Sequence, residues 1–197
     1  MKETILMIDG ENFKNKIEDV FKENTKEAPV WHEYDFAGLL NGVLKDIKID
    51  KRFFYFARIK EHEDTVKKSK ELIEIQRRLK SHLENQGFKV IIAGRVRGQY
   101  ERDKKGEKVL VFKEKGVDVR IGVDMVTWAC DKVLGTVIVG SSDSDLQPAI
   151  YESKRRQVEC IYLGFETNPN KGLSYTTKRT ILIRNSEVLK AEKLTLF

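Results

Sequence analysis

The chain has 197 residues, close to the size of one domain, and its 40% hydrophobic and 35% charged residues provide both a core and a strongly solvated surface. This composition excludes a largely disordered chain, and no apolar run reaches the roughly 20 residues of a membrane helix. The net charge of +6 is unevenly placed: residues 1–50 carry −4, residues 51–150 carry +6 and residues 151–197 carry +4. A polyanionic partner such as nucleic acid is compatible with this distribution.

Short apolar runs alternate with amphipathic stretches along the chain. A buried strand is predicted at 4–8, ended by a turn at Asp9-Gly10, and apolar residues at helical spacing follow over 33–47. Next come a strand at 52–57, a long helix from about Asp64 to a stop at Gly87, and a strand at 88–93. Strands at 135–140 and 158–163 flank a helix over about 145–155, and a short strand at 181–183 precedes a terminal helix.

This alternation predicts an α/β fold built from βαβ units, with a parallel sheet covered on both faces. We expect one domain over 1–197, with a core at about 4–165 and a C-terminal extension over 166–197. The first residues show no secretory leader. Two cysteines, Cys130 and Cys160, are too few for a disulfide framework or a zinc site and are expected as reduced core thiols. A cytoplasmic protein with no membrane association is therefore expected.

Residues 95–115 differ in character from the rest of the chain. Two alternating runs flank the turn signal Asp103-Lys104-Lys105-Gly106, which predicts a β-hairpin insert. The insert holds eight Lys or Arg residues against four Asp or Glu residues. Such a hairpin could contact a phosphate backbone, although a solvated edge hairpin protected by charge has the same composition.

The segment 117–130 fits either a strand or a helix. Its first nine residues alternate strictly, yet two stripes at helical spacing extend over the whole segment. One stripe is apolar (Val119, Val123, Val126 and Cys130) and the other is polar (Arg120, Asp124, Thr127 and Asp131). Two long periodic stripes favour a helix. That helix would carry Asp118 in its first turn.

Acidic residues stand where strands or helices end or begin. Asp9 follows the first strand, Asp143 and Asp145 follow the strand at 135–140, and Asp118 opens the preceding helix. Each alone could be a helix N-cap. Because ligands bind outside the carboxyl ends of parallel strands, we expect these side chains to converge there. Carboxylates brought together repel one another, and a divalent cation such as Mg²⁺ is the usual reason for tolerating them. The basic surface makes a phosphodiester the natural substrate.

Three motifs, in this order, carry a family resemblance: Ile8-Asp9-Gly10-Glu11-Asn12, Lys115-Gly116-Val117-Asp118-Val119 and Ser141-Ser142-Asp143-Ser144-Asp145. The chain resembles the NYN domain family, which comprises LabA-like proteins related to the PIN-domain ribonucleases. The resemblance covers roughly residues 4–165. It implies a PIN-like three-layer α/β/α sandwich with a mainly parallel central sheet. It also implies hydrolysis of RNA by a metal-dependent endoribonuclease.

Carried over by position, the resemblance makes Asp9, Asp118, Asp143 and Asp145 the catalytic acidic site that binds Mg²⁺ or Mn²⁺. Asn12 would orient the first Asp or touch substrate, and Asp124 and Ser141 would be peripheral. Single-stranded RNA is the expected partner, and a homodimer is left open. The residues expected to contact the RNA backbone are Arg95, Arg97, Lys104, Lys105 and Lys115.

Two other functions compete with this hypothesis. A catalytically inactive NYN-like module could bind RNA or a protein without cleaving it, and Ser142, where the family usually has glycine, keeps this reading open. A metal-dependent phosphatase on a similar sheet is the third hypothesis. Against it, the first strand is followed by Asp9-Gly10-Glu11 and lacks a second Asp two residues after the first.

Overall fold

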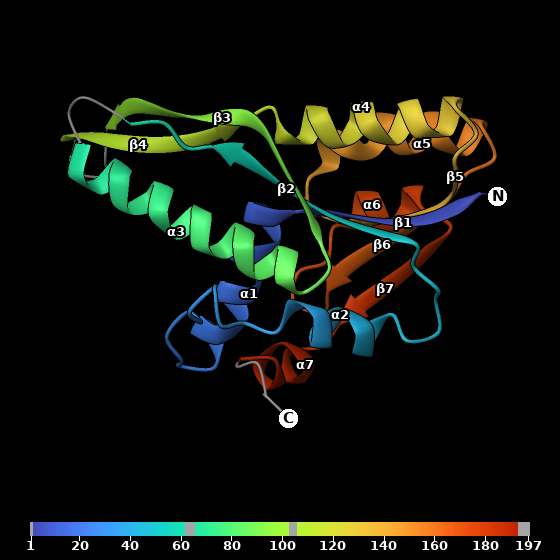
Figure 1. The fold of residues 1–197 in the computed structure, drawn as a ribbon, viewed down its shortest axis with the longest axis horizontal. Helices are drawn as coiled ribbons and strands as arrows, with labels where there is room; N and C mark the ends of the chain where they lie inside the picture. Colours follow the sequence, from blue (N-terminus) through green and yellow to red (C-terminus); the bar gives the residue numbers. More distant parts are fainter. Residues whose placement is uncertain (1, 62–65, 103–105, 193–197) are drawn as a thin grey trace.

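The computed structural model describes residues 2–61, 66–102 and 106–192, and within them seven strands form one sheet (Figure 1). The strand order is β4-β3-β2-β1-β5-β6-β7. The strands are β1 (Glu3–Asp9), β2 (Lys51–Arg58), β3 (Lys89–Arg102), β4 (Lys108–Lys115), β5 (Leu134–Gly140), β6 (Glu159–Phe165) and β7 (Arg179–Ile183).

The sheet is parallel except for β4, which pairs antiparallel with β3. After β1 the chain builds β2, β3 and β4 outward on one side, and then returns to place β5, β6 and β7 on the other side. The strand order therefore reverses at β1, next to β5. In open parallel sheets this switch point leaves a crevice at the carboxyl ends of the strands, which is where ligands bind.

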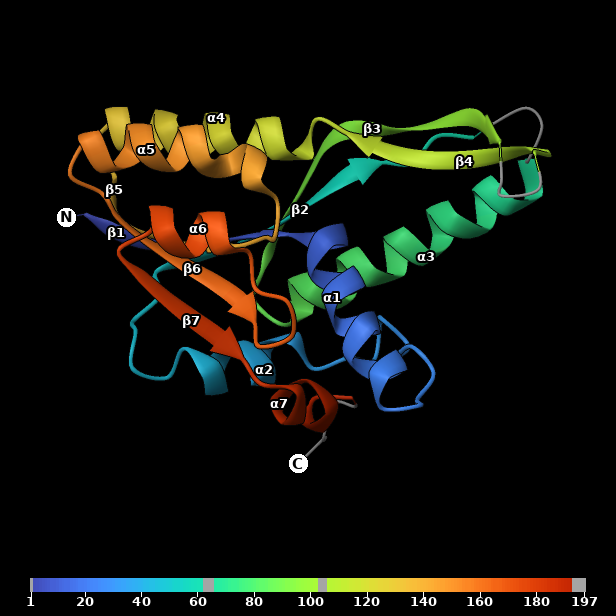
Figure 2. The same cartoon turned by 180° about the vertical axis from the view of Figure 1, so that it is seen from behind.

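Helices cover both faces of the sheet (Figures 1 and 2). One face carries α1 (Gly10–Glu23), α2 (Phe36–Val43), α3 (Val66–Asn85) and α7 (Asn185–Lys190). The other carries α4 (Val117–Cys130), the short 3₁₀ helix η2 (Ser144–Leu146), α5 (Gln147–Arg155) and α6 (Lys171–Thr176). None of the helices in the described ranges combines the length and the apolar character that crossing a membrane requires.

Alternating side chains of the central strands fill two cores. Leu6 and Ile8 of β1 pack toward α1 and α2, whereas Ile5 and Met7 pack toward α4 and α5. All four are at most 1% exposed. A strand buried on both faces reads as a continuous apolar run, which is why the sequence at 4–8 indicates a central strand. The protein is thus the three-layer α/β/α sandwich with a mainly parallel sheet that the sequence predicts, including the antiparallel hairpin near 95–115.

Three local expectations differ from the structure. The residues after β1 form no separate turn, because Asp9 caps α1 and that helix begins at Gly10. The sequence analysis also predicts no helix at 171–176, where α6 lies; this single short turn is capped by Asn170. Cys160 is buried as expected, but Cys130 is exposed at the end of α4 and is not a core thiol.

The segment 117–130 is the predicted helix, but the apolar stripe used to predict it does not face the core. Val119 and Val123 are 63% and 55% exposed. The buried face of α4 is formed instead by Val117, Ile121, Met125 and Ala129, with Asp124 beside them. Apolar residues thus occur at helical spacing on two sides of α4, so periodicity identifies the helix without showing which side is inward.

The C-terminal segment extends the same sheet and core. β7 pairs in parallel with β6, and α7 packs against α1 and α2. The buried hydroxyl of Tyr34 donates a hydrogen bond of 2.9 Å to the carbonyl oxygen of Val188 in α7. Ile183 and Val188 are completely buried in the core beneath α1 and α2. The packing therefore continues without a break past residue 166.

We expect Tyr34→Phe to destabilise the protein, because it leaves the Val188 carbonyl without this buried partner. The expected loss is about 1–2 kcal/mol, or a fall of about 2–8 °C in melting temperature for a chain of this size. Tyr175→Phe is the matched control, since Tyr175 is 88% exposed. Equal melting temperatures of the two variants would show that this hydrogen bond contributes little to stability.

Candidate functional site

The carboxyl ends of β1 and β5 and the beginning of α4 meet around one acidic cavity of about 210 Å³. Asp9 lies at the end of β1, Asp143 follows β5, and Asp118 lies in the first turn of α4. Asn12 and Lys115 also line this cavity. The structure thus brings together five of the residues that the sequence places in the site.

Three of the carboxylates form the tightest group. Asp118, Asp143 and Asp145 each offer an oxygen, and these oxygens lie within 4.8 Å of one another. Asp118 and Asp143 are half-buried, and Asp145 is exposed. Hard oxygen ligands at this spacing suit Mg²⁺ or Mn²⁺, and a cation would neutralise their mutual repulsion. The donor set therefore fits a divalent metal ion.

Asp9 is the buried carboxyl group of the cavity. It is 8% exposed, and its Oδ1 accepts a 3.1 Å hydrogen bond from the backbone N–H of Asn12, as the N-cap of α1. Burial raises the pKa of Asp9 from 3.8 to about 6, and the charges of Asp143 and Asp118 add to this effect. The side chain is thus both a helix cap and part of the acidic cluster, so capping alone does not account for its environment.

Two glutamates that the sequence analysis does not select also line the cavity, Glu11 and Glu114. Burial, together with the neighbouring charges of Asp9 and Glu11, raises the pKa of Glu114 to about 7. Glu114 lies on β4, opposite Val96 of β3 and one residue from the exposed Lys115. Successive side chains of a strand face opposite sides of the sheet, so Glu114 faces away from Lys115. This alternation is the sequence signal that could have identified Glu114 as an inward-facing residue.

The loop after β5 is fixed by hydrogen bonds at both backbone groups of Ser142. Its N–H donates to Oδ1 of Asn12 at 2.8 Å, and its carbonyl oxygen accepts from Nδ2 of Asn170 at 2.8 Å. Asn170 is held in turn by the N–H of Leu173, which donates to its Oδ1 at 2.9 Å. Asn12 therefore orients the third motif through its side chain, whereas its backbone N–H binds Asp9.

Ser142 is compatible with this loop. It is not among the residues with a positive φ, so the backbone conformation here does not require glycine. The buried hydroxyl of Ser141 accepts a 3.1 Å hydrogen bond from the N–H of Asp143. Asp143 in turn accepts a 2.9 Å bond from the N–H of Asp145 through its Oδ1. Ser141 thus lies beneath the cluster as a support for the loop.

Asp124 lies apart from the cavity, on the buried side of α4. Its Oδ2 accepts a 3.2 Å hydrogen bond from the Tyr55 hydroxyl of β2, and its Oδ1 accepts a 2.8 Å bond from Nε of Arg120. Burial and the Asp124 charge raise the pKa of Tyr55. The bond to Tyr55 shows that Asp124 has a structural role, which is to link α4 to β2 of the sheet.

Three cations occupy neighbouring positions across the hairpin side of the sheet. Arg58 of β2 is in register with Arg95 of β3, and Arg95 is in register with Lys115 of β4. All three are exposed. The backbone of Arg97 pairs with Lys113, while Lys104 and Lys105 lie outside the described residues. Like charges at adjacent ladder positions disfavour the sheet, so this row is suited to an anion.

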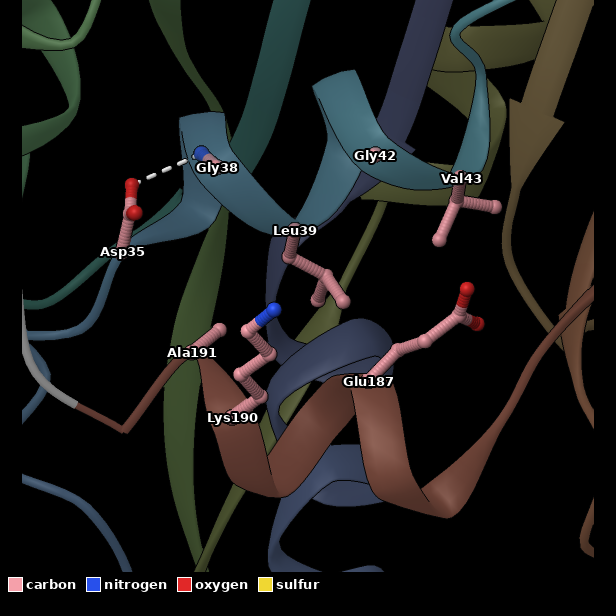
Figure 3. Close-up of a pocket in the computed structure, with 8 residues that line it drawn as sticks. All are labelled: Asp35, Gly38, Leu39, Gly42, Val43, Glu187, Lys190 and Ala191. Carbon is pink, nitrogen blue, oxygen red and sulfur yellow. Dashed lines mark hydrogen bonds between the residues drawn. The ribbon is translucent and has the colours of Figure 1, made fainter.

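A larger cavity, of about 310 Å³, lies between α2 and α7 (Figure 3). Its two carboxylates are explained by helix ends. Asp35 caps α2 by accepting a 2.7 Å bond from the N–H of Gly38, and Glu187 accepts a bond from the N–H of Arg184 at the start of α7. Leu39 and Val43 supply much of the remaining wall. This cavity therefore lacks the clustered carboxylates of the acidic one.

The structure is thus an α/β/α sandwich with acidic side chains gathered at the switch point of its sheet. Comparison with protein families matches residues 3–183 to the NYN domain. The chain belongs to the NYN domain family, as its three motifs indicated. No curated protein matches the chain.

A solved structure with a similar fold is that of a protein of unknown function from Vibrio parahaemolyticus. The two chains share 16% sequence identity, with a TM-score of 0.60. The match covers 92% of this chain and 93% of the other. The similarity therefore extends over most of the fold of both proteins.

The raised pKa values of Asp9 and Glu114 predict how stability depends on pH without metal. Between about pH 4 and pH 7 the folded protein holds protons that the unfolded chain has released, so the free energy of unfolding falls as pH rises. For Asp9 the shift corresponds to about 3 kcal/mol. Asp9→Asn keeps a capping oxygen and removes the part of this pH dependence that comes from Asp9, while Glu114 remains.

Thermal unfolding in a chelator, from pH 4.5 to pH 7.5 in small steps, measures this difference. The melting temperature of Asp9→Asn should fall less across this range than that of the wild type. Asp131→Asn, which changes an exposed residue at the end of α4, should follow the wild type. Parallel curves for Asp9→Asn and the wild type would contradict a raised pKa at Asp9.

Proposed function

We propose that the protein is a metal-dependent ribonuclease that hydrolyses phosphodiester bonds of single-stranded RNA at the acidic cavity. The observation that supports this most is the grouping of Asp118, Asp143 and Asp145 within 4.8 Å in a member of the NYN domain family. The proposal includes a cytoplasmic location and endonucleolytic cleavage.

In this proposal Asp118, Asp143 and Asp145 hold Mg²⁺ or Mn²⁺, with Asp9 at the buried side of the same cavity. A bound divalent ion supplies Lewis-acid chemistry: it neutralises charge on the phosphate and makes a coordinated water more acidic. Asp9 is well placed to bind a proton near neutral pH because its pKa is raised to about 6. It could therefore accept a proton or, once ionised, contribute to cation binding.

The loop contacts serve this chemistry by fixing the ligands before the substrate arrives. Asn12 and Asn170 hold both backbone groups of Ser142, and Ser141 holds the N–H of Asp143. Ligands whose positions are fixed by packing and hydrogen bonds lose little entropy when a metal binds. We therefore assign Asn12 and Asn170 as positioning residues.

The cationic row of Arg58, Arg95 and Lys115 would bind the RNA backbone beside the cavity. Lys115 lines the cavity itself, so the row leads directly to the carboxylates. Contacts to phosphates supply affinity without sequence information. A single strand is favoured because its backbone and bases can follow a surface of this kind more freely than a duplex can.

Cleavage of RNA should depend on both the metal and the carboxylates. Purified protein should cleave a labelled single-stranded RNA in Mn²⁺ or Mg²⁺ and stop in excess chelator. Asp118→Asn and Asp143→Asn should each lower the cleavage rate by at least about 100-fold, because removing one oriented charge from such a site costs several kcal/mol. Asn at 143 keeps the capping oxygen, so the fold should be preserved.

Asp131→Asn, outside the site, should cleave at the wild-type rate. Activity that persists in Asp118→Asn would indicate a contaminating nuclease. RNA binding without cleavage in either metal would instead support the alternative, a NYN-like binding module that does not cut.

The cationic row predicts how binding depends on salt. In a chelator, Arg95→Gln with Lys115→Gln should weaken single-stranded RNA binding and reduce the slope of log K against log salt by about 0.7 for each lost phosphate contact. Lys132→Gln with Lys178→Gln is a control that removes two exposed cations elsewhere. Fluorescence anisotropy at four salt concentrations measures both slopes. An unchanged slope in the Arg95→Gln, Lys115→Gln variant would show that the cationic row does not bind the RNA backbone.

A further inference from the structure

A second cavity, of about 200 Å³, adjoins the acidic one beneath the β3–β4 hairpin. It lies between α3 and the ends of β2, β3 and β4, and most of its wall is apolar. Glu11 and Glu114 line both cavities. The apolar wall is formed by Phe56, Ile59, Leu72, Val96 and Phe112.

We propose that this cavity binds one nucleobase of the RNA strand whose phosphodiester lies at the acidic cavity. The proposal rests on the ribonuclease function proposed above and adds to it a base-binding subsite with a preference for certain bases. Continuity with the acidic cavity is the first argument, since a base bound here would have its own backbone next to the carboxylates.

The start of α1 makes this continuity possible. The Phe56 ring lies so close to Gly10 that a Cβ at that position would be 2.2 Å from Cε1 of Phe56. Gly10 therefore allows an aromatic ring to occupy the space immediately after Asp9. Phe56 lines the second cavity, and its ring lies against Gly10. Gly10 directly follows Asp9, which lines the acidic cavity.

The charges around the cavity favour a nucleotide over an apolar molecule. Lys68 of α3 lies at the margin of the cavity, with its Nζ 5.9 Å from the centroid of the Phe112 ring, and Lys115, next to Glu114 in sequence, lines the adjoining acidic cavity. An aromatic and aliphatic wall with cations at its margin is what an RNA base and its phosphate require. An apolar side chain of a protein would gain nothing from these cations.

The polar groups of the cavity are mainly acceptors. Nε2 of Gln76 already donates a 2.8 Å hydrogen bond to the carbonyl oxygen of Ala57, which leaves Oε1 as the amide atom able to bind a ligand. The carboxyl groups of Glu11 and Glu114 add acceptor oxygens, of which Oε2 of Glu11 already accepts a 3.0 Å hydrogen bond from Nζ of Lys14. Adenine and cytosine present exocyclic amino donors, whereas uracil presents a carbonyl oxygen at the same place. We therefore expect adenine and cytosine to be preferred over uracil.

The test measures binding without cleavage. Fluorescence anisotropy in a chelator compares labelled rA8, rC8 and rU8 on the full chain. The wild type should bind rA8 and rC8 at least about fivefold more tightly than rU8, as one well-placed base contact allows. Leu72→Trp fills the cavity and should reduce this ratio to about one. Ile73→Trp, the next residue of α3 and 37% exposed, is the matched control and should keep the ratio.

Phe112→Leu provides a second variant should Leu72→Trp melt at a markedly lower temperature, because it removes the ring but keeps an apolar side chain. It should also reduce the ratio. A wild type that binds the three RNAs equally, or ratios that persist in both Leu72→Trp and Phe112→Leu, would overturn the base subsite and leave the cavity to an apolar side chain of a protein partner.

Cleavage, assayed separately in Mn²⁺, distinguishes this inference from the function on which it rests. Cleavage without base preference would overturn the subsite and support the ribonuclease. A base preference that is lost in Leu72→Trp, without cleavage of any RNA, would support the subsite on a protein that binds RNA only. Absence of all RNA binding would overturn both.

Discussion

The repulsion among carboxylates at the switch point of the sheet is the constraint on which the rest of the site depends. Asp9, Asp118 and Asp143 come from three separate parts of the chain and line one cavity, and Asp145 joins two of them. Without a cation this arrangement costs stability: burial raises the pKa of Asp9, and the charges of Asp143 and Asp118 contribute to the increase. The fold must therefore hold the group together by other means, which are the packing of β1 against β5 and the hydrogen bonds of the loop after β5.

Those hydrogen bonds connect distant segments through short polar side chains. Asn12 joins α1 to the loop, and Asn170 joins the same loop to the start of α6. Asn170 is uncharged, and it acts by holding the loop in position. Its Nδ2 donates a 2.8 Å hydrogen bond to the carbonyl oxygen of Ser142, and its Oδ1 accepts one from the N–H of Leu173. The region after β6 thus supports the site directly, as well as extending the sheet through β7.

The strands and the four aspartates could be predicted because each has a local signal in the sequence: an apolar run marks a strand, and an acidic residue stands where a strand ends or a helix begins. Glu114, Asn170 and the inward face of α4 have no such local signal. Alternation turns Glu114 inward only once β4 is known to pair with β3, and Asn170 reaches Ser142 across 28 positions of sequence. On α4, apolar residues occur on two sides of the helix, so the sequence does not show which side faces the core. The structure shows it, because Ile121, Met125 and Ala129 are buried.

The hairpin divides its two faces between different kinds of contact, and alternation along the strands imposes the division. Arg95 and Lys115 are partners in the ladder, as are Val96 and Glu114 one position further. Side chains of directly opposed residues lie on the same face, so at these two positions the cations Arg95 and Lys115 fall on one face and Val96 and Glu114 on the other. A single basic hairpin can thereby offer phosphates a charged surface while its other face closes, with α3, a largely apolar cavity beside the carboxylates. The composition of 95–115 therefore indicates a basic hairpin, but it gives no sign that Val96, Phe112 and Glu114 line a cavity beneath it.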